Sequence, residues 1–321
     1  MKYLITLIVS VLFLVGCGGD KPQASADKPT AATHADTVAL RVALMPTVDC
    51  LPFYYARRSG LYDSLGLDVD FRIFMAQMDV DTAMSGGGID GGFTDLVRAE
   101  LMYAREGTPV VVMATDGSLH VVVARSLRIR RPEQLKDRMV TVARHSATDL
   151  MSDLVAQAGG LAEDLIYRPQ INDIGLRTRM LDGTQIDAAV LPEPQATAAV
   201  LNGHRRIYDN SQAKFQPGCV VFRRSCLQSK SRKAQVRKLI EGYNRAAESI
   251  NRGGKAVCDS VLLVDYRLTR EVVDTLRLPH YRTATLPAAD DLNRALDFLR
   301  RRGLVEPSFS VEKLTDGSYL K

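Results

Sequence analysis

The segment His145–Asp149 (HSATD) carries the residue types that most directly suggest binding chemistry, because it opens a predicted helix. The first N–H groups of a helix have no internal partners, and the helix dipole adds partial positive charge there, so this end could bind an anion if it faces a cleft. Ser146 and Thr148 could add hydroxyl donors, and His145 a donor or a proton-dependent charge. Helix capping by Ser146 and Asp149 is the alternative interpretation, and Asp149 would repel a ligand carboxylate.

A second motif, G-x-G-x-x-G at Gly86–Gly91, matches the dinucleotide-binding fingerprint. That fingerprint follows a strand and opens a helix, whereas this sequence predicts a helix at 79–85 and a strand at 89–93. We therefore interpret residues 86–88 as a helix stop, and the small residues after Asp90 as a place where backbone could approach a ligand. The sequence contains no G-x-S-x-G, H-E-x-x-H or P-loop motif, and we expect no cofactor, metal or catalytic residue.

The N-terminus predicts export. One cation precedes an apolar run at 3–15, which is shorter than the roughly 20 residues of a membrane span and has the layout of a secretory signal. The run ends in LVGC at 14–17, which resembles the bacterial lipoprotein box and implies acylation of Cys17. An ordinary signal peptide with an incidental cysteine is the alternative. We expect a lipoprotein signal at 1–16, then the lipidated cysteine and a flexible, polar tether at 17–38.

Composition and cysteine spacing narrow the function classes. Charged residues make up 25% and hydrophobic ones 46% of the chain, as in ordinary soluble domains, and the net charge is +5. The densest basic run, 125–131, has no interleaved aromatics, so we expect no nucleic-acid partner. No C-x-x-C pair exists, which argues against zinc-ribbon and thioredoxin-like sites. Beyond the lipid site, Cys50, Cys219, Cys226 and Cys258 allow three disulfide pairings, all of which stay open.

From residue 38 onward, strand-like and helix-like stretches alternate, which favours mainly parallel sheets flanked by helices. Strands are predicted at 38–45, 67–74, 89–93, 109–114, 120–124, 139–143, 186–191, 206–208 and 219–222. Helices are predicted at 52–62, 79–85, 95–105, 131–135, 146–158, 172–181, 194–201 and 231–251, with a mostly helical remainder. We expect an α/β fold with two lobes: lobe 1 from 39–120 plus 221–321, with a helical C-terminal tail, and lobe 2 from 121–220.

Polar residues at predicted strand ends are candidate contacts, because ligands of open α/β sheets bind beyond the carboxyl ends of strands. Thr94 follows the strand at 89–93, and Ser118 lies near the first crossover between lobes. Asp95, beside Thr94, is interpreted as a helix N-cap.

Four segments, in order, resemble type-2 periplasmic solute-binding proteins of ABC importers, in the branch for sulfonates, nitrate and thiamine-pyrimidine precursors. They are LRVALMPTVDCLPFYYARRSGLYDSLGLDVDF, AMSGGGIDGGFTDL, PEQLKDRMVTVARHSATDLM and GTQIDAAVLPEPQAT. The resemblance covers roughly 39–225 and implies two lobes that close on a small solute. Asp137-Arg138 replaces the usual Gly-Lys turn, and the chain has no Trp.

The resemblance implies further ligand contacts. It places Thr47 and Asp49 in a ligand-contacting loop, where Asp49 could accept from an amine or amidine; a turn or capping role is the alternative. It places Glu193 at the cleft, where its carboxylate could accept from a cationic or hydroxyl group, with a hinge role as the alternative. The candidate ligand-binding residues are Thr47, Asp49, Thr94, Ser118, His145, Ser146, Thr148 and Glu193.

Together these features predict the solute-binding lipoprotein of an ABC importer. We expect a monomer on the periplasmic side of the cell envelope, lipid-anchored to the membrane, which passes a small polar or anionic solute to a permease with its ATPase. One alternative is an enzyme on the same fold, acting on a pyrimidine-type or small anionic substrate. A nucleotide-binding oxidoreductase, or a surface or signalling lipoprotein without transport, are others.

Overall fold

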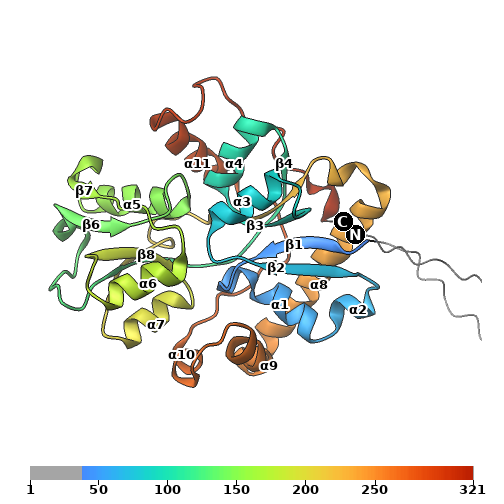
Figure 1. Cartoon of the computed structure of the whole chain (residues 1–321), viewed down its shortest axis with the longest axis horizontal. Coiled ribbons are helices and arrows are strands. Elements are labelled where there is room, and N and C mark those ends of the chain that lie inside the picture. Colours follow the sequence, from blue (N-terminus) through green and yellow to red (C-terminus); the bar gives the residue numbers. More distant parts are fainter. Residues whose placement is uncertain (1–37, 321) are drawn as a thin grey trace, which may run out of the picture. The chain divides into compact units, whose positions relative to one another are not determined.

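The computed structural model describes residues 38–320. The predicted signal peptide, Cys17 and nearly all of the predicted tether lie outside the described residues. Two five-stranded sheets form the framework, one in the order β2-β1-β3-β10-β4 and the other in the order β7-β6-β8-β5-β9 (Figure 1). We call the first sheet with its helices lobe 1, and the second sheet with its helices lobe 2.

The strands follow the predicted alternation closely, with small shifts in their bounds. They are β1 (Leu40–Leu44), β2 (Val69–Ile73), β3 (Gly91–Asp95), β4 (Pro109–Ala114), β5 (Leu119–Val123), β6 (Arg138–Thr141), β7 (Ile166–Tyr167), β8 (Ala188–Pro192), β9 (Arg205–Asp209) and β10 (Gly218–Arg223). The sequence does not predict β7, which has only two residues and therefore shows no periodicity. β3 begins two residues later than predicted, because Ile89 and Asp90 belong to the turn that precedes it.

Helices α1 to α7 lie between strands along the chain, as the alternating pattern requires, and α8 to α11 follow the last strand. They are α1 (Leu51–Arg58), α2 (Leu61–Ser64), α3 (Gln77–Ser85), α4 (Leu96–Glu106), α5 (Ala147–Ala158), α6 (Ile174–Asp182), α7 (Gln195–Leu201), α8 (Lys230–Gly253), α9 (Lys255–Ser260), α10 (Arg270–Thr275) and α11 (Ala289–Arg301). The C-terminal region is mainly helical, but residues 276–288 run without a helix between α10 and α11. None of the described helices is both long and apolar enough to cross a membrane.

Period-two alternation in the strands gives each sheet two covered faces. In β1, Leu40, Val42 and Leu44 face a core shared with α1 and α8, whereas Ala43 faces a second core shared with α4 and α11. In β5, Val122 belongs to the core that packs under α6 and α7, whereas Val121 and Val123 belong to the second core. Figure 1 shows α1 and α8 beside β1 and β2, with α6 and α7 beside β8.

The chain crosses between the sheets twice, at 115–118 and at 210–217. Each crossing leads into the one antiparallel strand of its sheet: β5 runs antiparallel to β8 and β9, and β10 to β3 and β4. The remaining strands of each sheet run in one direction, so their carboxyl ends form a common edge. Both sheets are thus mainly parallel, as expected.

Candidate functional site

A small cavity lies where residues from the edges of the two sheets meet. Its volume is about 40 Å³, room for roughly three water molecules. Its lining comes from both lobes and both crossings: Met45, Thr47, Asp49, Gln77, Phe93, Asp95, Gly117, Ser118, Leu119, Ala147, Thr148, Asn172, Ile174, Arg177, Pro192, Gln216, Pro217 and Gly218. Four predicted contacts, Thr47, Asp49, Ser118 and Thr148, are therefore brought together.

The two lobes touch directly around this cavity. The Val48 amide donates to the Glu193 carbonyl at 3.0 Å, and the Ile174 amide to the Met75 carbonyl at 3.1 Å. The Gln195 side-chain amide donates to the Pro46 carbonyl at 3.0 Å. Each such bond contributes about 1 kcal/mol, and together these contacts hold the two lobes against each other.

Asp49 is held in a cradle of backbone. Its Oδ1 accepts from the Thr115 hydroxyl at 2.9 Å. Cβ atoms added to Gly117 and Gly218 would lie 2.0 Å and 2.5 Å from the Asp49 carboxylate oxygens, so glycine is required at both positions. Burial raises the pKa of Asp49 to about 6, although the Thr115 hydrogen bond opposes the shift.

The Asp95 carboxylate lies at the N-terminus of α5, the helix end at which the sequence predicts an anion site. Its Oδ1 accepts from the Arg98 amide at 3.1 Å, which makes it the predicted N-cap of α4. The same oxygen also accepts from the Ala147 amide at 3.0 Å, in the first turn of α5 in the other lobe. Asp95 Oδ2 is buried and has no partner among the described residues. Burial raises the pKa of Asp95 to about 6, against the lowering effect of Arg98.

The segment before α5 is organised mainly by capping. Ser146 is fully buried and its hydroxyl accepts from the Thr148 amide at 3.1 Å, and Asp149 accepts from the His145 amide at 2.9 Å. Ala147 and Thr148, in the first turn of α5, are the residues of this segment that line the cavity. His145 lies outside it, in a surface depression with Arg144 and Asp149. The backbone of His145 has a φ of 56°, in the left-handed region that few residues other than glycine adopt.

Glu193 and Thr94 are also outside the cavity lining in this conformation. The Glu193 carboxylate accepts from the Thr197 amide at 3.0 Å, pairs with Arg206 and lies 3.3 Å from His120 Nε2. Burial opposes ionisation of Glu193, but the hydrogen bond and charge of His120 together with Arg206 lower its pKa overall. Thr94 is buried within the first sheet, opposite Cys219 of β10. Among the described residues its hydroxyl has no partner.

Arg177 is the main cavity residue that the sequence reading missed. It is 2% exposed and donates from Nη1 to the Val190 carbonyl at 2.8 Å. Burial lowers the pKa of Arg177 to about 10, so the side chain stays cationic at neutral pH. A signal was present in the sequence: Ile174, Arg177 and Leu181 form the buried face of α6 at helical spacing, and an arginine on such a face is unusual.

Two tyrosines from the C-terminal region hold the loop that carries Thr47 and Asp49. The Tyr266 hydroxyl donates to the Thr47 carbonyl at 2.7 Å, and the Tyr281 hydroxyl donates to the Val48 carbonyl at 2.9 Å. Both tyrosines are buried. They act as positioning residues for Thr47 and Asp49, and no local pattern in the sequence links residues more than 200 positions apart.

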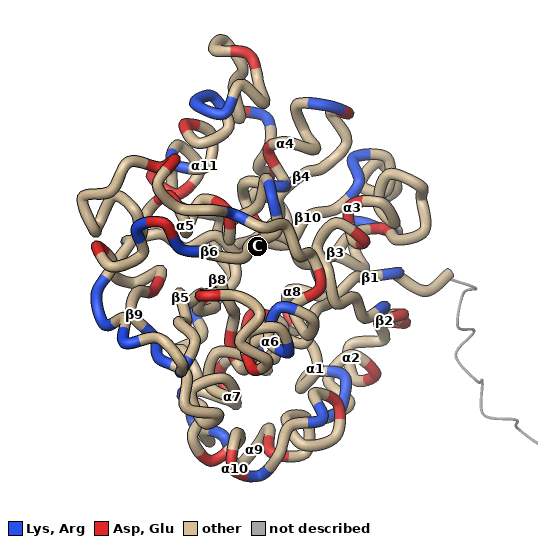
Figure 2. Tube along the Cα trace, turned by 60° about the vertical axis from the view of Figure 1, so that its left-hand side comes forward, with Lys and Arg blue, Asp and Glu red and all other residues tan. Residues whose placement is uncertain are grey.

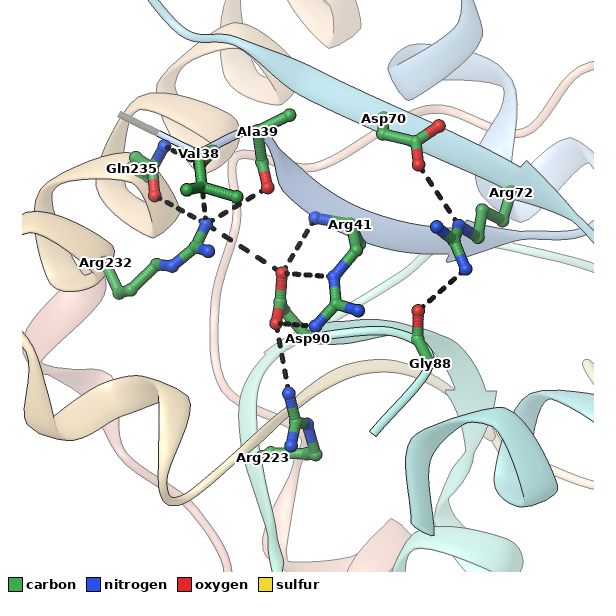
Figure 3. A network of polar contacts seen from close by, with 10 residues as sticks. All are labelled: Val38, Ala39, Arg41, Asp70, Arg72, Gly88, Asp90, Arg223, Arg232 and Gln235. Carbon is green, nitrogen blue, oxygen red and sulfur yellow. Dashed lines mark hydrogen bonds and ion pairs between the residues drawn. The ribbon is translucent and has the colours of Figure 1, made fainter. Parts of the chain in front are cut away.

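Asp90, from the glycine-rich motif, belongs to a structural network away from the cavity. Figure 3 shows Arg41, Arg223 and Arg232 converging on its carboxylate. Arg41 pairs with Asp90 at 2.8 Å, Arg223 at 3.1 Å and Arg232 at 3.8 Å. Burial opposes ionisation of Asp90, but the hydrogen bonds and charge of Arg41 lower its pKa overall. This turn precedes β3, so it lies at the end of the strand opposite to Asp95.

The described part of the chain offers no obvious metal centre or disulfide. No group of three or more His, Cys, Asp or Glu side chains in residues 38–320 could hold a metal ion. Cys50, Cys219, Cys226 and Cys258 are all buried and unpaired. None of the described residues that line the cavity is a His, Cys or Lys.

Comparison with known proteins agrees with this architecture. The family described as NMT1/THI5 like matches residues 47–250, more than half of the chain. No curated protein sequence matches the chain.

Three solved structures show the fold relationship. The alkanesulfonate-binding protein SsuA from Xanthomonas axonopodis pv. citri, bound to MOPS, is 16% identical with a TM-score of 0.73, covering 88% of this chain and 99% of that one. The periplasmic aliphatic sulphonate binding protein SsuA from Escherichia coli is 16% identical with a TM-score of 0.71, covering 86% and 91%. The desulfurization enzyme DSZB is 14% identical with a TM-score of 0.62, covering 88% and 97%. The chain belongs to the NMT1/THI5-like family and has the fold of type-2 periplasmic solute-binding proteins, as its sequence predicts.

Proposed function

We propose that this protein is the solute-binding component of an ABC importer and captures a small polar molecule between its lobes. The observation that carries the proposal is the cavity at the strand ends of both sheets, lined by buried polar groups from each lobe. A solute there contacts both lobes at once, so its binding stabilises the closed conformation over an open one. Two crossings beside the cavity, at 115–118 and 210–217, are the natural hinge.

The proposal extends to the way the protein works in the cell. A lipid on Cys17 anchors the chain at the periplasmic side of the cell envelope, and the tether at 17–38 lets the folded part reach a permease with its ATPase. The protein acts as a monomer, with residues 39–120 and 221–321 as lobe 1 and 121–220 as lobe 2. The binding proteins among its structural relatives support this proposal.

An enzyme on the same fold is the second candidate, because DSZB shares the architecture. The cavity gives it little support. Its lining in the described chain offers hydroxyls and carboxylates but no His, Cys or Lys to act as a base or nucleophile. Cys50, beside Asp49, is buried outside the lining, and burial raises the pKa of its thiol well above the usual range.

Native mass spectrometry of the full-length protein in mild detergent tests the proposal, together with thermal unfolding against a panel of small solutes. We expect a bound small molecule, or a rise in melting temperature with at least one solute class, because a ligand that binds only the folded state stabilises it. Turnover of a bound solute by the purified protein would favour the enzyme. Absence of any bound molecule and of any thermal shift, across anions, cations, zwitterions and pyrimidines, would contradict solute binding.

A further inference from the structure

Charges over the surface and charges in the cavity are arranged differently. Figure 2 shows Lys and Arg interspersed with Asp and Glu along the trace. Inside the cavity the ionisable side chains are segregated by lobe: Asp49 and Asp95 come from lobe 1, and Arg177 comes from lobe 2. All three are at most 6% exposed, and none forms an ion pair with another described residue.

No described cation pairs directly with Asp49 or Asp95: Arg98 lowers the pKa of Asp95 from nearby, but its guanidinium donates to Asp81 and to the Arg144 carbonyl. Asp95 Oδ2 is buried without a partner in the described chain, and the Asp49 carboxylate receives one side-chain hydroxyl. Burial raises the pKa of both acids to about 6, so both are largely ionised at neutral pH. A buried carboxylate without a cation is costly, and an ammonium or amidinium group of a ligand would offset that cost.

On the lobe 2 side of the cavity, the Arg177 guanidinium lacks described acceptors for some of its N–H groups. Only one guanidinium nitrogen of Arg177, Nη1, donates to a described acceptor, and Nε is buried without one. Asp173 is the acidic group that acts on it, and Asp173 already caps α6 through the Leu176 amide at 2.6 Å. A guanidinium binds oxyanions through paired hydrogen bonds, so an anionic group of a ligand suits this position.

A singly charged solute fits this arrangement poorly. A simple oxyanion would meet Arg177 but also two carboxylates, and Asp95 already takes the Ala147 amide at the start of α5. A simple cation would satisfy the acids and leave the buried guanidinium unpaired. A solute that carries both charges can pair with the carboxylates of lobe 1 and with the guanidinium of lobe 2, and it connects the lobes when they close.

We propose that the cavity recognises a small zwitterion, with its cationic nitrogen held by Asp49 and Asp95 of lobe 1 and its oxyanion held by Arg177 of lobe 2. This rests on the proposed solute-binding function and names the class of solute. The oxyanion is a carboxylate or a sulfonate, and the test separates them.

Binding to matched compounds, measured by calorimetry on the full-length protein in mild detergent, tests the charge requirement. The compounds are 3-aminopropanoate with propanoate, 3-aminopropane-1-sulfonate with propane-1-sulfonate, and propylammonium. We expect at least one aminated acid to bind at least about tenfold more tightly than its deaminated partner and than propylammonium, about 1.4 kcal/mol. A deaminated acid that binds as tightly as its aminated partner would overturn the inference.

Charge-removing variants test the named residues. Asp95→Asn keeps an oxygen acceptor for the Arg98 and Ala147 amides but removes the charge, so we expect at least a tenfold loss for the zwitterion and no loss for the deaminated acid. Arg177→Gln should lose the zwitterion, and Arg177→Lys should recover part of the affinity. Asp70→Asn, on the exposed part of β2, is the control and should bind as the wild type does. Equal losses for both compounds in Asp95→Asn, with folding intact, would contradict the assignment.

Native mass spectrometry separates failure of this inference from failure of the proposed function. A co-purified solute that lacks either charge would overturn the zwitterion and leave solute binding intact. Absence of any co-purified solute, combined with no binding of any of the five compounds, would count against both. A co-purified zwitterion supports both.

Discussion

The two ends of β3 hold acidic residues only five positions apart, yet these residues are in opposite situations. Before the strand, Asp90 accepts from Arg41 and pairs with Arg223 and Arg232, and these contacts lower its pKa. At the other end, Asp95 has no ion pair with a described residue, and burial raises its pKa to about 6. At one end of the strand the carboxylate pairs with arginines, and at the other end one carboxylate oxygen accepts from two amides while the second has no partner in the described chain.

The difference follows from the polarity of the sheet. The carboxyl ends of parallel strands meet at one edge, where loops and helix N-termini converge and a ligand can reach them. The amino ends meet at the opposite edge, where the chain enters the sheet and long arginines from β1, β10 and α8 can close over a buried acid. We therefore expect stability to depend mainly on the acid before β3, and the proposed binding chemistry on the acid at its carboxyl end.

Asp90→Asn should give the largest loss of stability. It removes a carboxylate whose side chain is 4% exposed and leaves three arginines without their common partner. Because those arginines are partly solvated, we expect a loss of about 2–3 kcal/mol in the free energy of unfolding. Chemical denaturation measures it. Asp70→Asn is the matched control: it removes an exposed pair with Arg72 and should cost less than about 0.5 kcal/mol. Equal effects of the two variants would remove the contrast between the strand ends.

The acids of the cavity and Asp90 should contribute to the free energy of unfolding with opposite dependence on pH. Asp49 and Asp95 have folded pKa values of about 6, above the roughly 3.9 of an unfolded Asp, so between about pH 4 and 6 the folded state binds more protons. Their contribution to the free energy of unfolding therefore increases as the pH falls from 7 toward 4. The folded pKa of Asp90 is lowered below the unfolded value of about 3.9. Its stabilising contribution to the free energy of unfolding is therefore fully present above about pH 4 and is lost as the pH falls further.

Asp95→Asn isolates the first of these effects. In the ligand-free protein we expect it to reduce the increase in stability between pH 7 and pH 5 by about 1 kcal/mol. Thermal unfolding of variant and wild type at both pH values measures it. An unchanged difference between the two pH values would mean that the Asp95 carboxylate is compensated in the ligand-free state.

Thr94→Val should have the smallest effect. The Thr94 hydroxyl is buried without a partner in the described chain and lies off the cavity lining, and Val keeps the branched shape that suits a strand. We expect a change in stability within about 0.5 kcal/mol and unchanged affinity for a bound solute. A tenfold loss of affinity would restore Thr94 as a ligand contact in the open conformation.

The sequence predicted the elements well because their signals are local. A short apolar run identified the strand of 38–45, and period-two alternation identified that of 67–74. The absence of a preceding strand argued against a nucleotide loop at 86–91, and Ser146 is the helix cap that its type suggested. Of the eight candidate contacts, Thr94, His145, Ser146 and Glu193 do not line the cavity, whereas Thr47, Asp49, Ser118 and Thr148 do. Their role as ligand contacts stays a prediction.

What the sequence could not predict depends on contacts between distant segments. Whether the start of α5 is open to a ligand was decided by Asp95, more than fifty positions earlier and in the other lobe. Whether Glu193 faces the cavity was decided by Arg206 and His120. The positions of Thr47 and Val48 depend on Tyr266 and Tyr281.

The sequence by itself determined the fold class, the order of the elements and the strand ends where polar residues gather, because hydrophobic periodicity and capping act within a few residues. Only the tertiary structure decided which charges meet. Coulombic and hydrogen-bonding partners are set by the packing of two sheets whose strands are exchanged through the crossings, and no local pattern encodes that packing. The placement of Asp49 and Asp95 opposite the lobe that carries Arg177 is its main consequence.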